Sequence, residues 1–178
     1  MTRRTHIAWT LVLISLHVLG LGAPASAAVR IDAGADLQAD AETVRQIEEL
    51  FNRAEEAIGK KDLDALMTVY SDHYRYQELT KADMRKIWKV FLEKYDRIST
   101  LHSFSRVVVT SGKHPTARIT CTGALWATSD RNDERVNLSS WAGDVHQLSY
   151  EEGAWRIVGQ GRIAPNRPEF GKAPPPLF

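Results

Sequence analysis

The sequence has a single cysteine, Cys121, among its 178 residues. One cysteine cannot form a disulfide within the chain, so the fold has to be held together by its apolar core. Cys121 shares a face of its predicted strand with Ile119 and Leu125, because residues two or four positions apart in a strand point the same way. This pattern favours a buried thiol over a reactive one.

The chain also lacks an excess of charge of either sign. It carries 23 Lys and Arg residues against 22 Asp and Glu residues, which gives a formal net charge of +1. Proteins that bind nucleic acids neutralise phosphates with clustered basic side chains. The sequence has no basic run of that kind, so we expect no nucleic-acid partner.

Motifs for metal and phosphate chemistry are missing as well. Neither H-x-x-x-H nor H-E-x-x-H spacing occurs, and there is no G-x-S-x-G sequence or phosphate-binding glycine loop. Beyond the N-terminal segment the histidines are scattered, at His73, His102, His114 and His146. From this spacing we expect no metal site and no cofactor.

The N-terminus has the pattern of an export signal. Two arginines precede an apolar run over residues 7–22, and a cleavage motif of small residues ends at Ala27. We therefore expect residues 1–27 to be a signal peptide cleaved after Ala27. The mature protein would then be periplasmic or secreted, without stable membrane insertion. An uncleaved membrane anchor is the alternative interpretation of this segment.

The remaining chain divides into three parts. Residues 28–40 are small and polar and predict a flexible leader, and residues 164–178 are proline-rich and predict a disordered tail. Residues 41–163 contain no internal repeat and have the length of one domain.

The first half of this domain predicts three helices. Apolar residues recur at helical spacing after Asp40, Asp62 and Thr80, and each of these residues can cap the helix that follows. Asp83, three residues after Thr80, completes a capping-box pattern.

The second half predicts a sheet. After Ile98 the apolar period changes from 3.6 to 2, and short turn sequences separate four predicted strands. Connections this short join antiparallel neighbours. The order predicts an α+β fold, in which three N-terminal helices pack on a curved four-stranded antiparallel sheet with one additional short strand.

Two stretches resemble a known superfamily. "KKDLDALMTVYSDHYRY" is similar to a recurrent segment of the nuclear transport factor 2-like superfamily, and "GDVHQLSYEEGAWRIVGQ" is similar to its closing hairpin. The resemblance covers roughly residues 42–163 and is strongest to the SnoaL-like and ketosteroid-isomerase-like domains. It implies a cone-shaped fold with a pocket between the concave sheet and the helices, and a superfamily that includes enzymes, carriers and interaction modules.

The resemblance to ketosteroid isomerases also implies positions for three functional residues. Their general base falls near Glu78 and their acid falls on Asp144. Their tyrosine falls on Ala54, which has no hydrogen-bond donor. Without that donor a dienolate oxygen loses half of its stabilisation, which argues against ketosteroid chemistry.

Asp144 and His146 stand two residues apart on a predicted strand. They therefore share one face, with Cα atoms about 6.5–7 Å apart, and Leu148 follows on the same face. If that face is the concave one, the two side chains enter the pocket and can hold one proton between them. The alternative is an ordinary cross-strand hydrogen bond at a solvated rim.

Other residues are assigned to the pocket more simply. Tyr76, His102 and Trp126 are predicted to line it, with a role in the apolar core as the alternative for Tyr76 and His102. Glu78 is either a base aimed at the pocket or a solvated acid near a helix N-terminus. Trp141 is opposite in parity to Asp144, so it predicts an outer sheet face that pairs two copies of the chain.

Three functions are compatible with these observations. The leading hypothesis is an exported protein that binds a small, mostly apolar molecule in the cone. The alternative is a proton-transfer enzyme, an isomerase, dehydratase or cyclase, that uses Asp144 with Glu78 or His146. The third is an envelope protein-interaction module that uses the outer face of the sheet and the proline-rich tail.

Overall fold

The computed structural model describes residues 29–128 and 134–162. The helices are α1 (Ala41–Gly59), α2 (Leu63–Met67) and α3 (Lys81–Lys94). The strands are β1 (Val29–Gln38), β2 (Arg75–Tyr76), β3 (Leu79–Thr80), β4 (Arg97–Thr110), β5 (Thr116–Thr128), β6 (Arg135–Glu151) and β7 (Ala154–Arg162). The predicted signal peptide (1–27) and proline-rich tail (164–178) lie outside the described residues.

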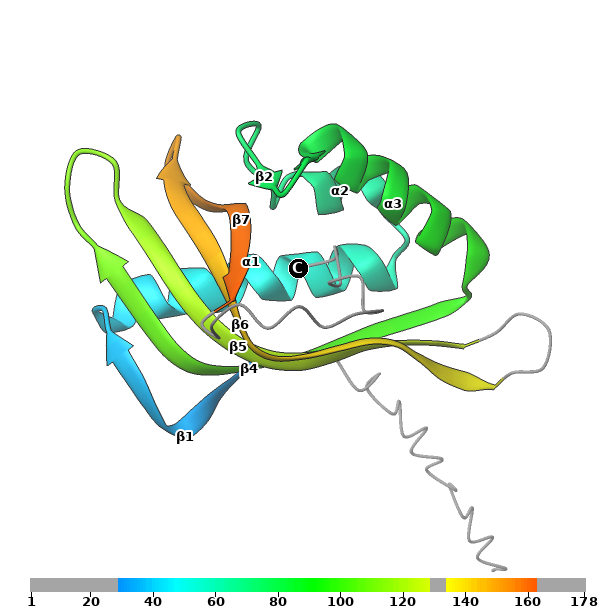
Figure 1. Cartoon of the computed structure of the whole chain (residues 1–178), viewed down its shortest axis with the longest axis horizontal. Coiled ribbons are helices and arrows are strands. Elements are labelled where there is room, and N and C mark those ends of the chain that lie inside the picture. The colour runs from blue at the N-terminus through cyan, green and yellow to red at the C-terminus, as the bar shows by residue number, and fades with distance from the viewer. Residues whose placement is uncertain (1–28, 129–133, 163–178) are drawn as a thin grey trace, which may run out of the picture.

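The elements form two layers. Five strands make one curved sheet in the order β1-β4-β5-β6-β7, and β2 and β3 form a separate two-stranded ribbon. Figure 1 shows the helices on the concave side of the sheet, with α1 nearest to it. The predicted α+β architecture of helices packed on a curved sheet is therefore confirmed.

The fifth strand of the sheet was not predicted. Residues 28–40 were expected to be a flexible leader, but Val29–Gln38 form β1, which runs parallel to β4. Val29 and Ile31 pack against the core, and Asp36 forms an ion pair with Arg106 of β4 at 2.9 Å. The segment is ordered because the edge of β4 offers unpaired backbone groups, which a sequence window of small and polar residues does not reveal.

The helix starts agree with the sequence. Asp40 accepts a hydrogen bond from the backbone N–H of Thr43 at 2.7 Å, and Asp62 accepts one from Ala65 at 2.9 Å. Thr80 and Asp83 form the predicted capping box at the start of α3. Each cap satisfies backbone N–H groups that have no partner within the helix.

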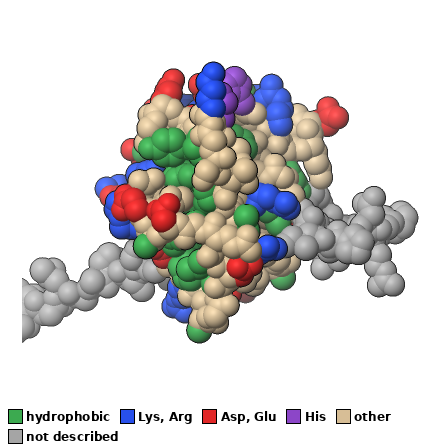
Figure 2. Space-filling model, turned by 90° about the vertical axis from the view of Figure 1, so that its left-hand side faces the viewer, with side chains coloured by type: hydrophobic (Ala, Val, Ile, Leu, Met, Phe, Trp, Pro, Cys, Tyr) green, Lys and Arg blue, Asp and Glu red, His purple; other side chains and the backbone are tan. Residues whose placement is uncertain are grey.

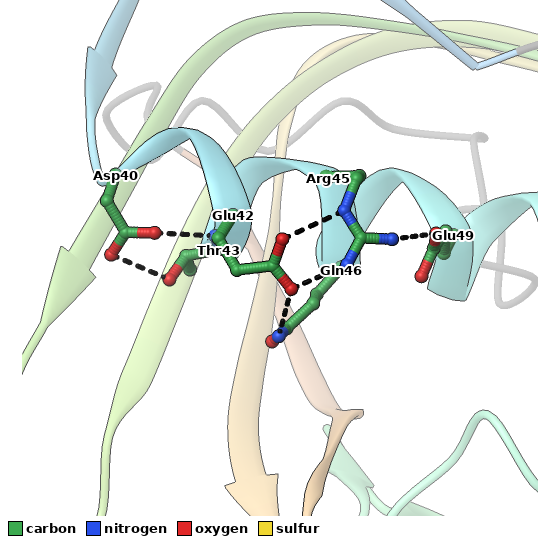
Figure 3. A network of polar contacts seen from close by, with 6 residues as sticks. All are labelled: Asp40, Glu42, Thr43, Arg45, Gln46 and Glu49. Atoms are coloured by element: carbon green, nitrogen blue, oxygen red, sulfur yellow. Dashed lines mark hydrogen bonds and ion pairs between the residues drawn. The ribbon is translucent and has the colours of Figure 1, made fainter.

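Two opposite faces of α1 determine how it packs. Its outer face carries the polar network of Figure 3, in which Glu42 and Arg45 are joined at 2.9 Å. Exposed pairs of this kind stabilise a helix only slightly. The opposite face is buried against the sheet, and its members are Val44, Ile47, Leu50, Phe51, Ala54, Ala57 and Ile58. Burial of this apolar face determines which residues α1 presents to the sheet.

A β-bulge in β6 reverses the predicted position of Trp141. Cys121 pairs with Asp144, but Gly123 pairs with Trp141, so β6 contains one extra residue between these two pairs. Gly143 lies in this interval with φ of 70°, a conformation that glycine adopts without steric cost. The extra residue turns the indole of Trp141 to the inside, where it is buried, and not to the outer face as predicted.

The surface carries charges of both signs. Figure 2 shows Lys and Arg side chains interspersed with Asp and Glu side chains on the face that it presents. Among the described residues, no helix has the length and apolar character needed to cross a membrane.

Gly123 should be sensitive to the addition of one methyl group. A Cβ at this position would lie 2.1 Å from the backbone oxygen of Leu101 and 2.4 Å from the Trp141 ring. We therefore expect Gly123→Ala to lower the free energy of unfolding by about 1–3 kcal/mol. The matched control is Gly59→Ala, where a Cβ meets nothing within 4 Å and stability should be unchanged or higher. Urea unfolding of both variants checks this, and equal stabilities would contradict it.

Candidate functional site

Four polar side chains from four elements meet between α1 and the concave face of the sheet. His102, Cys121 and His146 come from the adjacent strands β4, β5 and β6, and one ligand-type atom of each lies within 4.8 Å of the others. The Cys121 Sγ atom is 3.5 Å from Nδ1 of His102. Glu55 reaches in from α1, with its Oε1 3.3 Å from Nε2 of His102. We call these four residues the interior cluster.

Aromatic rings surround the cluster. The Phe51 ring centroid lies 5.2 Å from the centroid of each imidazole, His102 and His146, and 5.0 Å from that of Phe104. The ring of Trp141 is 5.2 Å from that of His102, and its Nε1 donates a hydrogen bond of 3.4 Å to Cys121 Sγ. The cluster therefore lies in surroundings of low polarity, where charged forms are disfavoured.

Solvent reaches almost none of this cluster. The His102 and His146 side chains are 1% and 0% exposed, and Glu55 retains only 7% of its side-chain exposure. Neither ring nitrogen of His146 has a hydrogen-bond partner among the described residues, and the contact of Glu55 Oε1 with His102 lacks the geometry of a hydrogen bond. Such atoms cost stability when they are buried, so a structure that keeps them calls for an explanation.

Burial shifts the pKa of the acid upward and the pKa values of the two histidines downward. It raises the pKa of Glu55 to about 8, an effect partly opposed by a hydrogen bond from the Thr100 backbone. Burial lowers the pKa of His102 to about 3. Burial, and secondarily the neighbouring His102, also lowers the pKa of His146 to about 3. At neutral pH the cluster thus combines a protonated carboxyl group with two neutral imidazoles.

Gln160 of β7 is a polar neighbour of His146. The two residues are partners in the β6–β7 register, and the Gln160 amide acts weakly against the lowering of the His146 pKa. The amide does not reach hydrogen-bond geometry with either ring nitrogen. The imidazole therefore keeps its donor and its acceptor available for another group.

Burial shifts the pKa of the Cys121 thiol upward, as it does for Glu55. Burial raises the pKa of Cys121 to about 12, and the negative charge of Asp144 adds to this. The hydrogen bond from Trp141 acts against the shift. The predicted buried, protonated thiol is consistent with this environment.

Some of the residues that were predicted to line a pocket lie on the concave face of the sheet. His102, His146 and Leu148 are buried there, and half-buried Asp144 pairs with Cys121 across β5 and β6. Asp144 is not among the atoms that converge within 4.8 Å. The strand parity that predicted His146 and Leu148 to share the inner face with Asp144 agrees with this arrangement.

Three other predicted residues lie away from the cluster. Glu78 is exposed in the turn between β2 and β3, so it is the solvated acid of the two alternatives. Tyr76 is half-buried on β2, in the small ribbon. Trp126 alternates with the buried Leu125, and its ring lies against the guanidinium group of Arg135 at 4.9 Å instead of lining the interior.

Sequence reasoning missed Glu55 and the role of Cys121. Glu55 lies four residues after Phe51 and three before Ile58, so it falls on the apolar face of α1. The signal in the sequence that could have identified Glu55 was an acidic residue within an apolar stripe. Ala54, the neighbouring residue in the chain, is buried as well. Glu55, one position further along, brings a carboxyl group to the interior.

Three cavities lie elsewhere among the described residues. A cavity of about 470 Å³ lies beside the start of α3 and is lined in part by Met67, Arg75 and Arg85. Another of about 800 Å³ lies near the β4–β5 and β6–β7 turns, and a third of about 170 Å³ lies on the convex face of the sheet at Arg106 and Arg118. None of these three is lined by a member of the interior cluster.

No family model matches the chain, and no curated protein does. Solved structures do. A conserved protein from Planctomyces limnophilus has a TM-score of 0.56 and 14% identity over 68% of this chain and 94% of its own. A protein of the NTF2-like family from Streptomyces avermitilis, proposed to be a dehydratase, has a TM-score of 0.50 and 12% identity over 68% and 95%.

A third structure, Aln2 from a Streptomyces species, has a TM-score of 0.55 and 10% identity over 69% of this chain and 91% of its own. These likenesses concern the path of the backbone. The fold is the NTF2-like cone. At identities this low the shared fold carries no function by itself, so function has to be argued from the residues of the site.

Glu55 should make stability fall as the pH rises. Folded Glu55 keeps its proton up to a pKa of about 8, whereas its ordinary value is 4.5. Its contribution to stability is fully present below pH about 4.5 and is lost as the pH rises through about 8. Glu55→Gln removes this titration, so the free energy of unfolding should decline less between these pH values than in the wild type.

Glu56→Gln is the matched control, because Glu56 is the exposed neighbour that pairs with Lys60. It should keep the wild-type decline. Denaturant unfolding at several pH values measures all three proteins, and an unchanged pH slope in Glu55→Gln would contradict the assignment.

Proposed function

We propose that this protein binds a small, mostly apolar molecule between α1 and the concave face of the sheet. Glu55 and His146 hold the polar group of that molecule, and the surrounding aromatic rings contact the remainder. The periplasm or the exterior of the cell is the proposed location, on the strength of the sequence of residues 1–27. Pairing of two copies through the outer sheet face remains a prediction, now without Trp141 as its basis.

One observation carries this proposal. His146 is fully buried, yet both of its ring nitrogens lack hydrogen-bond partners among the described residues. An unsatisfied buried polar group costs about 1–3 kcal/mol. A bound molecule with one hydroxyl or carbonyl group recovers part of that cost, because neutral imidazole offers one donor and one acceptor.

The surroundings support an apolar ligand. Phe51 presents its ring to both imidazoles, Trp141 lies against His102, and Phe104 packs on Phe51, so these rings supply apolar area around the polar groups. Because the cluster is closed to solvent in the described conformation, binding includes a separation of α1 from the sheet. The ligand then fills space that side chains otherwise occupy, which limits it to a small molecule.

A second candidate function follows from the contact between Glu55 and His102. A carboxyl group and an imidazole 3.3 Å apart can act as an acid–base pair, with His146 available on the other side of the space. In a dehydration, one imidazole would remove the proton next to a carbonyl group while the carboxyl group protonates the departing hydroxyl as water. Dehydration is also the reaction proposed for the Streptomyces avermitilis protein that shares the fold, which makes it the reaction class to test first.

This version replaces the residues that the sequence suggested. The proton-transfer hypothesis required convergence of its groups, and Glu78 is exposed while Asp144 stands outside the converging atoms. Only His146 remains from the original set. The reaction therefore rests on Glu55, His102 and His146.

Native mass spectrometry of gently purified protein tests the binding proposal. We expect the wild type to retain an organic adduct, and His146→Phe, which keeps the ring and removes both nitrogens, to retain it about tenfold more weakly. His114→Phe is the matched control, because His114 is exposed in the β4–β5 turn, and it should bind like the wild type.

Two results would argue against the proposal. One is wild-type protein that carries no organic adduct in any preparation. The other is full retention of the adduct by His146→Phe. Extraction of a retained adduct then gives the compound with which Glu55→Gln can be tested for loss of turnover.

A further inference from the structure

We propose that His102, Cys121 and His146 form a binding site for a transition-metal ion, with Zn²⁺ as the ion that fits best. The three side chains lie on adjacent strands, and their donor atoms fall within 4.8 Å of one another. This inference goes beyond the proposed function: it shares His102 and His146 with that proposal and adds Cys121, which takes no part there.

The separation of Cys121 and His102 suits tetrahedral coordination. Zn²⁺ binds sulfur at about 2.3 Å and imidazole nitrogen at about 2.0–2.1 Å, so tetrahedral angles place sulfur and nitrogen about 3.6 Å apart. The Cys121 Sγ to His102 Nδ1 distance of 3.5 Å is close to that value. Both residues stand on the paired strands β4 and β5, which hold them in this position.

The neighbours of the cluster match the outer shell of a metal site. A metal-binding histidine usually presents its other ring nitrogen to a carboxylate or carbonyl group, which fixes the ring orientation. His102 presents Nδ1 to the thiol and Nε2 to Glu55 Oε1, at 3.3 Å. Trp141 Nε1 donates to Cys121 Sγ at 3.4 Å and would stabilise negative charge on the sulfur.

His146 provides an independent reason to expect an ion. Its two nitrogens are fully buried without hydrogen-bond partners among the described residues, and one coordinate bond would satisfy one of them. Two imidazoles and a thiolate select borderline and soft ions such as Zn²⁺ or copper over Mg²⁺ and Ca²⁺, which prefer oxygen. Three protein ligands leave a fourth position for water or another small ligand.

Metal binding requires a proton to leave. The thiol S–H bond breaks, the S–metal bond forms, and one proton is released to solvent for each ion bound, while both imidazoles bind as neutral ligands. The spacing of the sequence concealed this set, because the ligands come from separate strands and not from one helix or loop.

Co²⁺ binding to the purified full chain, after treatment with a chelator, tests the inference. We expect one Co²⁺ per chain, a near-ultraviolet charge-transfer band from the thiolate, visible bands of tetrahedral intensity, and displacement of Co²⁺ by Zn²⁺. The wild-type spectrum decides the question without any variant. Absence of the charge-transfer band, with no stoichiometric Zn²⁺ uptake, would overturn the inference.

Variants then assign the ligands. Cys121→Ser should lose the charge-transfer band and bind Zn²⁺ more than about 100-fold more weakly, whereas Glu55→Gln should keep the band with affinity lowered about 10-fold to 100-fold. The matched control removes the exposed histidines His73 and His114 together and should bind like the wild type. Loss of binding in this control, or unchanged Zn²⁺ affinity in Cys121→Ser, would overturn the assignment.

The same variant separates this inference from the proposed function. If Cys121→Ser folds, it should lose the metal and still retain the organic adduct. Circular dichroism establishes folding, and Cys121→Ala serves if the serine variant does not fold. A metal without an adduct in the wild type would support the ion site and remove the small-molecule proposal.

Discussion

The packing of α1 against the concave side of the sheet is the interaction on which the rest of the structure depends. Phe51 stands at its centre, with its ring about equally close to His102, His146 and Phe104. Burial of such a ring contributes on the order of 2–3 kcal/mol and fixes the rotation of the helix about its axis. Once Phe51 is in place, Glu55, one turn later, has to face His102. The apolar contact therefore positions the polar site.

Local rules recovered the helices and the general architecture. Asp40, Asp62 and Thr80 cap helices because a short polar side chain next to an apolar periodic segment satisfies orphan N–H groups whatever the tertiary structure. The change of apolar period after Ile98 marks the sheet for a similar reason. Strand β1 escaped this reasoning because its order comes from a partner far away in the chain, the edge of β4. No short window contains that information.

The site was also predictable only in part, because much of it depends on contacts between residues that are far apart in the chain. His146 and Leu148 follow from strict alternation along β6. Trp141, three residues before Asp144, does not, because the bulge at Gly143 inserts a residue and inverts the parity of Trp141 relative to Asp144. The convergence of Glu55, His102 and Cys121 depends on strand register and on the angle at which α1 crosses the sheet. Periodicity marks Glu55 as an acid within an apolar stripe, but it identifies no partner for that acid.

If the interior cluster were only part of a structural core, it would lower the stability of the protein. Filling the same volume with Leu and Phe would leave no polar atom unsatisfied, and buried polar groups without partners lower stability. Proteins tolerate such local violations mainly at functional sites. An organic ligand or a metal ion would each give His146 a partner, but the two differ at Cys121. A molecule with one polar group does not require a thiol, whereas an ion would be coordinated by the sulfur. The position of Cys121, between two imidazoles and under the indole N–H of Trp141, is therefore the part of the cluster that an organic ligand leaves unexplained and an ion explains.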